Sequence, residues 1–324
     1  MTTGGGLPVS TPLPVTPSPY ITPELLTQAP TGISWASIPA GKDVTPAQRI
    51  AEQANICARA TGMVDDAAHQ PLRATTDSVV LYGPGVRVWA PQGCSTQPAI
   101  LILKRWPVLQ VNSIQVAQNT FPVVWESVPA GNWSVQNPVS GLYGSIAPTA
   151  AAEGGQGVLV NSQYVNWAYG RNGYAIEVQY LNGWPHCGLT ANVASGASTI
   201  TVDDCTGWAI TSPLTGYTGA TGTVYDAGSQ EVIQVTAASA ASGPGTLTLA
   251  APLQSAHSAG TIVSTLPANV GWAAIMFAVA QALTRGATST TVHQIPGGPG
   301  GPAPSPDDWM KCAKAMLSDY ARII

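Results

Sequence analysis

A histidine–cysteine pair and two adjacent aspartates are the residues with the clearest capacity for metal chemistry. His186-Cys187 and Cys205 would supply three zinc ligands, but no Cys-x2-Cys pair occurs and no spacing brings the three together. Asp203-Asp204 would offer oxygen ligands to calcium, yet no EF-hand pattern surrounds them. A strand that ends in a turn explains these aspartates better. We therefore predict no metal site.

Motifs for nucleophilic or phosphate chemistry are missing from the sequence. The chain has neither a Gly-x-Ser-x-Gly elbow nor a Gly-x4-Gly-Lys-Ser/Thr loop. The glutamates show no spacing that implies a paired-carboxylate site. The remaining histidines stand alone, and we expect surface or loop positions for them: His69, His257 and His293. These observations predict a protein that is not an enzyme and binds no cofactor.

Tryptophans leave a second type of function open. Four of them could stack on sugar rings, as in a carbohydrate-binding or adhesion protein: Trp133, Trp167, Trp184 and Trp208. The alternative is that they fill β-sheet cores and subunit interfaces, where tryptophan is enriched. We favour this alternative and keep the first as a competing hypothesis.

Charge is scarce along the chain. Of 324 residues, 12 are Lys or Arg and 16 are Asp or Glu, so 9% are charged and the formal net charge is −4. Soluble globular proteins carry about 25% charged residues, and a monomer normally relies on them for solubility. The basic residues form no runs, which argues against a protein that grips nucleic acid through its phosphates. The scarcity of charge favours an assembly component whose surface other subunits cover.

Patterns for secretion and membrane insertion are also missing. The first ten residues show neither the basic nor the apolar region of a signal peptide. The longest apolar stretch, 270–283, has 14 residues, fewer than the roughly 18 that a membrane span needs. We expect a buried helix there and no membrane partner. The five cysteines are scattered and odd in number, which indicates free buried thiols.

Residues 1–21 form a proline-rich arm without helical or strand periodicity. Such a segment favours an extended, polyproline-like chain and cannot build its own core. We expect it to become ordered against a neighbouring subunit or an adjoining ring. Its apolar side chains are the predicted partner-binding residues: Leu7, Val9, Leu13, Val15, Tyr20 and Ile21.

Residues 22–187 combine helix signals with strand signals. Thr22-Pro23-Glu24 begins a short helix that ends before Pro30, and Thr45-Pro46 begins a longer one through a cap threonine and a first-turn proline. Gly62 is its predicted end or weak point. The expected buried face of this helix comprises Ile50, Ala54, Cys57 and Ala58. Strands are predicted at 79–82, 100–103, 108–116 and 174–180, and Asn182-Gly183 indicates a turn.

Residues 188–266 differ in composition from their surroundings. They are rich in Thr, Ser, Ala and Gly, and they contain four acids but no Lys or Arg. Strands are predicted at 199–202, 230–236 and 246–249. We interpret this segment as a small β-module inserted between two parts of a parent fold.

Residues 267–324 return to helical periodicity and complete the body begun by the N-terminal helix. Gly286 ends the first of two helices, and Ser305-Pro306-Asp307-Asp308 begins the second with a cap serine. The expected buried faces are Trp272, Ile275, Met276, Val279, Ala280 and Leu283 in the first, and Trp309, Cys312, Ala313, Met316, Leu317 and Tyr320 in the second. The predicted fold is α+β: a helical body, an extensive antiparallel β-region and the inserted β-module.

The order of these parts resembles the head-to-tail adaptor, or connector, proteins of tailed double-stranded-DNA bacteriophages. The residues that carry the resemblance are the helix start at Thr45-Pro46, the strand Pro107 to Val116, Trp272 to Ile275, and Ser305 to Asp308 with the helix end Tyr320-Ala321-Arg322. The stretches 196–207 and 245–260 look like a small β-module that recurs in phage structural proteins. Compact family members differ, because they are mostly a helical bundle with a small β-element.

The resemblance implies a structural protein of the virion neck, made in the host cytoplasm. It implies a homo-oligomeric ring of about twelve copies, a dodecamer, that docks under the portal protein and continues its DNA channel. A downstream neck or tail-terminator protein would bind the other side. DNA would pass without sequence-specific binding, and the basic doublet Lys104-Arg105 would either contact it or lie as a solvated strand end. The competing hypothesis is a tail-associated carbohydrate-binding or adhesion protein.

Overall fold

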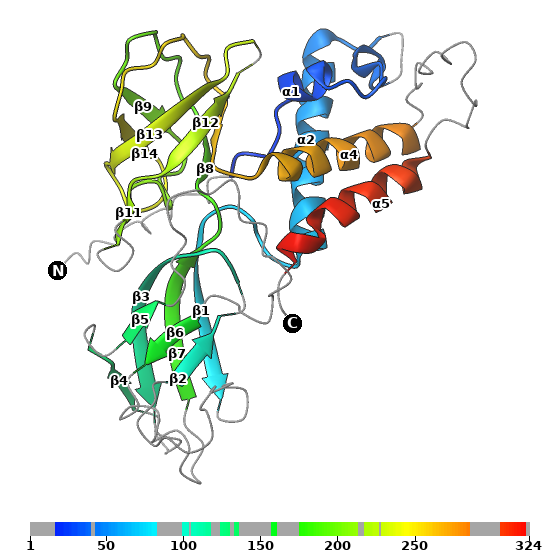
Figure 1. Cartoon of the computed structure of the whole chain (residues 1–324). Coiled ribbons are helices and arrows are strands. Elements are labelled where there is room, and N and C mark those ends of the chain that lie inside the picture. The colour runs from blue at the N-terminus through cyan, green and yellow to red at the C-terminus, as the bar shows by residue number, and fades with distance from the viewer. Residues whose placement is uncertain are drawn as a thin grey trace, which may run out of the picture.

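Helices and strands occupy separate parts of the computed structural model (Figure 1). The structure describes residues 17–39, 43–82, 99–103, 105–117, 124–129, 133–135, 157–160, 175–212, 217–226, 228–285 and 305–321. Within them, the helices form one body and the strands form antiparallel sheets. The protein is therefore α+β, as the sequence predicted.

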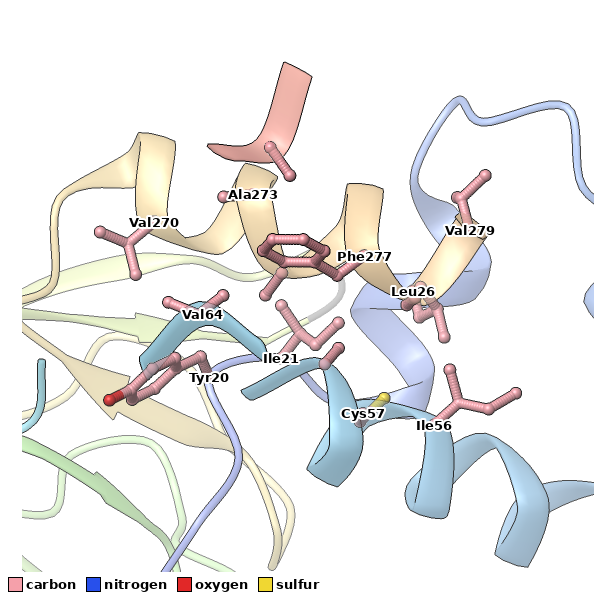
Figure 2. Close-up of a cluster of buried hydrophobic side chains, with 14 of the residues drawn as sticks. Tyr20, Ile21, Leu26, Ile56, Cys57, Val64, Val270, Ala273, Phe277 and Val279 are labelled. Atoms are coloured by element: carbon pink, nitrogen blue, oxygen red, sulfur yellow. The ribbon is translucent and has the colours of Figure 1, made fainter. Parts of the chain in front are cut away.

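Segments from both ends of the described chain build the helical body. Its elements are α1 (Pro23–Gln28), η1 (Trp35–Ser37), α2 (Pro46–Ala68), α4 (Ala268–Thr284), α5 (Pro306–Leu317) and η4 (Ser318–Tyr320). Helix α4 packs against both α2 and α5. Ile56, Val64 and Phe277 are buried in the common core (Figure 2). The prediction that the N-terminal helix packs with the two C-terminal helices is confirmed.

Capping boxes determine where α2 and α5 begin. In α2, the Gln48 N–H donates to Thr45 Oγ1 at 3.3 Å, and the Thr45 N–H donates to Gln48 Oε1 at 2.9 Å. In α5, Ser305 and Asp308 exchange the equivalent bonds at 3.2 and 3.0 Å. Each box satisfies two backbone donors that the helix itself leaves unpaired. Both predicted helix starts are confirmed.

Helix α2 continues past Gly62, so the predicted end at this glycine was wrong. The helix runs to Ala68, and His69 ends it in the left-handed conformation with φ 53°. A glycine inside a helix costs about 1 kcal/mol relative to alanine. Val64 and Ala68, which lie beyond the glycine, are fully buried, and this burial offsets that cost.

The buried face of α2 also differs from the predicted one. Ile50 is 60% exposed, and Ala54 and Ala58 are exposed as well. Of the predicted face only Cys57 is buried. The residues that face the core are Gln53, Ile56, Cys57, Ala60, Thr61, Val64 and Ala68. Alanine and threonine suit either face of a helix, so the few large apolar residues were a poor guide to its orientation.

The C-terminal helices expose three side chains that the sequence predicted to be buried. Trp272 in α4 is 41% exposed and Met316 in α5 is 37% exposed. Cys312 is exposed too. Helix α4 has no charged residue, so its periodicity does not distinguish a core face from an outer face. Its largest buried side chain is Phe277, which the predicted stripe omitted.

Six strands of the inserted segment form a small barrel. They are β8 (His186–Gly188), β9 (Thr199–Val202), β12 (Thr221–Tyr225), β13 (Glu231–Ala238), β14 (Gly245–Leu249) and β15 (Ile262–Ser264), in the order β8-β15-β12-β13-β14-β9. An antiparallel bridge between Leu189 and Val202 joins the first strand to the last. The Thr190 N–H also donates to the Thr201 carbonyl at 3.0 Å. These bonds close the sheet, which protects the strand edges.

The barrel occupies nearly the predicted β-module. Its strands span 186–264, against the predicted 188–266, and the three predicted strands correspond to β9, β13 and β14. Strands β8, β12 and β15 were not predicted. Two of these are only three residues long, which is too short for an alternating pattern to show. The short hairpin β10 (Thr211–Ser212) and β11 (Tyr217–Thr218) follows the buried Trp208.

The second β-unit contains the strands between α2 and the barrel. One sheet has the order β1-β7-β3-β4 and the other β2-β6-β5. Their bounds are β1 (Thr75–Tyr82), β2 (Ala99–Ile102), β3 (Val108–Ala117), β4 (Trp125–Ser127), β5 (Trp133–Val135), β6 (Gly157–Val160) and β7 (Ala175–Asn182). The predicted turn follows β7. There Gly183 has φ +93°, and a Cβ would lie 2.4 Å from the Arg73 carbonyl oxygen, so only glycine fits.

Candidate functional site at the N-terminal strap

Residues 17–21, which we call the strap, cross the junction between the helical body and the barrel. The Tyr20 hydroxyl donates to Asp65 Oδ1 at 2.6 Å. The Tyr20 hydroxyl oxygen in turn accepts the N–H groups of Leu72 at 3.0 Å and Arg73 at 3.1 Å. One side chain therefore fastens the strap both to α2 and to the segment that leads into β1.

The strap is fastened to the barrel by the two residues before Tyr20. Ser18 Oγ donates to Asp203 Oδ2 at 2.6 Å, and Asp203 Oδ1 accepts the Gly188 N–H at 2.7 Å. His186 Nε2 lies 3.0 Å from the Pro19 carbonyl oxygen. A Cβ on Gly188 would come within 2.4 Å of Ser18 Oγ, so the strap approaches the barrel at a position that requires glycine.

The structure corrects the roles of Tyr20 and Ile21. Both were predicted to bind a partner, but they are 5% and 2% exposed and lie in the core of their own subunit (Figure 2). The physical reason is that this core, formed by α2 and α4, has room for two more large side chains at its edge. The other predicted anchors, Leu7, Val9, Leu13 and Val15, lie outside the described residues.

The sequence around Ile21 contains a pattern that indicates its burial. Thr22 caps α1 by accepting the Leu25 N–H at 3.2 Å. Ile21 therefore precedes the cap, and Leu26 is the fourth helical residue, which is the spacing of a hydrophobic staple. Both side chains are buried in the same core. The staple pattern thus marks the point where the arm joins the folded subunit.

Burial sets the protonation of the Tyr20–Asp65 pair. It raises the pKa of Tyr20 well above its ordinary value, and the neighbouring charge of Asp65 acts in the same direction. Burial also raises the pKa of Asp65, although the hydrogen bonds from Tyr20 and Leu72 and the charge of Arg73 oppose it. The phenol therefore remains a proton donor, and the bond is maintained across the neutral pH range.

His186 and Ser264 form a buried pair. The distance between them suits a general base and a nucleophile, but their burial does not. Ser264 Oγ lies 2.9 Å from His186 Nδ1. Burial lowers the pKa of His186 to about 4, although the hydrogen bond to the Pro19 carbonyl opposes this. Since Nε2 faces a carbonyl oxygen, it carries the ring proton and Nδ1 accepts the serine hydroxyl. Ser264 is 2% exposed, so a substrate cannot reach it, and the pair serves to hold the strap.

His257 lies in the loop before β15, which is one of the two predicted alternatives, but it is buried there between two carboxylates and not on the surface. Its Nδ1 lies 3.0 Å from Asp226 Oδ2, and its Nε2 lies 2.7 Å from Glu231 Oε1. Burial tends to raise the pKa of Glu231, but the hydrogen bonds from His257 and the Gln254 backbone and the charge of His257 lower it overall. The carboxylates lie on opposite sides of the ring, so they cannot chelate a metal together with it. The group therefore ties β12, β13 and the loop before β15.

The aspartates and cysteines that were considered as metal ligands have structural positions instead. Asp204 Oδ1 accepts the N–H groups of Thr206 at 2.9 Å and Gly243 at 3.0 Å, which is the predicted turn after a strand. Cys187 and Cys205 are buried and unbridged. Across the described ranges, no three His, Cys, Asp or Glu side chains are arranged to hold a metal ion.

Of the basic doublet, Lys104 lies outside the described residues, and Arg105 is engaged within the subunit. Arg105 Nε lies 3.3 Å from Asp77 Oδ2. The Tyr180 hydroxyl donates to the same carboxylate oxygen at 3.2 Å. Asp77 thus neutralises the charge of Arg105 next to the sheet, which leaves less of that charge for a phosphate.

Two of the tryptophans proposed to stack on sugars are buried. Trp208 is 0% and Trp184 4% exposed, so neither presents a face to a ligand. Trp184 instead packs edge-on against Trp106, with ring centroids 5.4 Å apart, and against Tyr320 at 5.6 Å. This cluster joins the β-unit to the C-terminal end of the helical body. The side chains of Trp133 and Trp167 lie outside the described set.

Comparisons of the chain with family models, with curated proteins and with solved structures found no match. In the described part of the chain, no helix combines the length and the hydropathy that crossing a membrane requires. The functional assignment therefore depends on the sequence and on the geometry of the strap, the barrel and the helical body.

Proposed function

We propose that the protein is a structural component of a tailed-phage neck, which assembles into a ring between the portal and the tail and continues the DNA channel. The order of the parts supports the proposal. Helix α2 is followed by a large β-unit and an inserted barrel, and α4 and α5 then return to pack with α2. This is the order that carries the resemblance to head-to-tail adaptors.

The strap supports the proposal through the position of the arm. Residues 17–21 are fixed to α2 by Tyr20 and to the barrel by Ser18 and Pro19. The sixteen residues before them, which include the four other predicted anchors, therefore start from a defined point on the subunit surface. An arm with a fixed origin loses less entropy when it docks on a neighbour than one that starts from a mobile terminus.

The engagement of polar groups in internal bonds also fits a structural role. The most suggestive pair for catalysis, His186 and Ser264, is buried and holds the strap. The other histidine beside carboxylates, His257, ties three parts of the barrel together. Both groups maintain the shape of the subunit, which is what a component of a channel wall requires.

Location within the particle tests the proposal. Antibodies against the purified protein, carrying gold particles, would be imaged on intact tailed particles and on isolated tails. We expect label at the junction between head and tail. Label on tail fibres or at the tail tip would contradict the proposal and favour the adhesion hypothesis. An antibody against a major capsid protein is the control for access to the particle surface.

A further inference from the structure

The outer wall of the barrel is lined by threonine. Along β9, β12, β13 and β14, buried apolar side chains alternate with side chains that point outward. Thr199 and Thr201 of β9 lie directly opposite Thr248 and Thr246 of β14, which gives a two-by-two array of threonines. We call the outward positions of these four strands the threonine wall. No charged residue occupies any of them.

The part of the wall on β9, β13 and β14 lies away from the helical body. On the other side of the barrel, β8 and β15 are buried along their whole length. Figure 1 shows β9, β13 and β14 on the side of the barrel that is remote from the helical body. Val232 on β13 is 72% exposed, the highest value among the exposed large hydrophobic side chains in the described chain.

The few charges of the barrel are used internally. Residues 188–266 contain four acids and no Lys or Arg. Each acid is engaged within the molecule: Asp203 accepts from Ser18 and Gly188, Asp204 from Thr206 and Gly243, and Glu231 from the Gln254 N–H, while Asp226 Oδ2 lies 3.0 Å from His257 Nδ1. The barrel thus presents an uncharged polar face where a solvated sheet normally carries both signs of charge.

The side-chain chemistry of the wall suits burial in an interface. Threonine is branched at Cβ and nearly fixed at χ1, so ordering it costs little, whereas burying a Lys or Glu costs about 1.5–2 kcal/mol of side-chain entropy. Its hydroxyl supplies hydrogen bonds and its methyl supplies apolar contact. Depletion of charge is the compositional mark of an interface core.

Charge matching indicates the partner. A charged surface placed on the wall would lose its hydration and gain no counter-charge, and phosphates would meet a segment without Lys or Arg. Another copy of this chain, in which only 9% of the residues are charged, provides a matching uncharged surface. We propose that the threonine wall binds a second copy of this protein, so that the barrel of one subunit lies against its neighbour. This inference rests on the proposed ring and identifies the surface that joins its subunits.

Lysine substitutions on the wall test the inference. The variant Thr201→Lys/Thr248→Lys adds two charges at exposed positions, and Ala251→Lys/Ala256→Lys adds the same two charges at exposed positions of the loop after β14 as a control. Circular dichroism and thermal midpoints would establish that all variants fold. Light scattering after size exclusion would then measure the assembled fraction. We expect the wall variant to lose about tenfold or more in assembly, while the control assembles like the wild type.

The outcomes separate this inference from the proposed function. A ring that forms equally well with lysines on the wall overturns the inference and leaves the proposed function standing. A wild-type oligomer that is not a ring but that the lysines dissociate supports the wall and contradicts the ring. A wild-type chain that stays monomeric overturns the inference, as does lysine-sensitive binding of a monomer to a polysaccharide array.

Discussion

The Tyr20 hydroxyl lies 2.6 Å from Asp65 Oδ1 and also accepts two backbone N–H groups, from Leu72 and Arg73. A residue near the start of the chain thereby completes the hydrogen bonding of the segment between α2 and β1. The strap at the base of the arm is consequently part of the fold.

Removal of the Tyr20 hydroxyl should destabilise the subunit. Tyr20→Phe keeps the buried ring but removes the side-chain acceptor of the Arg73 N–H and one of the two donors to Asp65, while the Leu72 N–H keeps its bond to Asp65 Oδ1. We expect a loss of about 2 kcal/mol in the free energy of unfolding, measured by urea denaturation. Tyr225→Phe, at a half-buried position in the barrel, is the matched control. Equal effects of the two substitutions would show that the phenol contributes nothing specific.

The neutral state of His186 should make stability depend on pH. Its pKa is about 4 in the folded protein and near 6.5 when unfolded, so the unfolded chain binds more protons between these values. Stability should fall as the pH decreases from 6.5 to 4, by about 3 kcal/mol from this group. In His186→Gln this part of the slope should disappear. Parallel stability curves for the two proteins would contradict the prediction.

Introducing a charge should affect stability very differently at two neighbouring positions on α5. Leu317 is fully buried, whereas Met316 is 37% exposed. Leu317→Asp places an unpaired carboxylate in the helical core, and we expect it to abolish the folded state, at a cost of several kcal/mol. Met316→Asp should change stability by about 0.5 kcal/mol or less. Circular dichroism and thermal unfolding measure both, and similar behaviour of the two variants would refute the assigned orientation of α5.

Two truncations should separate the arm from the strap. Deletion of residues 2–16 leaves Tyr20 and Ile21 in place, so we expect a folded subunit of unchanged stability that assembles less well. Deletion of residues 2–21 also removes these two buried side chains, and the subunit should lose several kcal/mol of stability. Urea denaturation and sizing of the assembly provide the two measurements. If the shorter deletion assembles as well as the full chain, the arm has no role in assembly.

Features determined by neighbouring residues were predictable from the sequence. Thr45 and Ser305 each lie three residues before the side chain that completes a capping box, so these helix starts needed no tertiary information. The positions of β9 and β14 followed from alternating threonine and aliphatic residues. The same alternation already contained the threonine wall, although its significance appears only when the strands lie side by side.

Features determined by tertiary packing were not predictable. Helix α4 has no charged residue to mark an outer face, so only the structure shows that Phe277 points inward while Trp272 is turned outward. His257 looked isolated because its partners, Asp226 and Glu231, are 31 and 26 residues away in the sequence. Tyr20 was grouped with the arm because proline dominates the composition there, which hid its contacts with residues more than forty positions later.

Imaging of the purified full-length protein tests the central claim most directly. Negative-stain micrographs should show closed rings with an axial hole, with one subunit mass per repeat around the ring. The Thr201→Lys/Thr248→Lys protein, imaged at the same concentration, should show separate subunits. Wild-type particles that are only monomers, or compact trimers without an axial hole, would contradict the assignment of this protein to a ring of the phage neck.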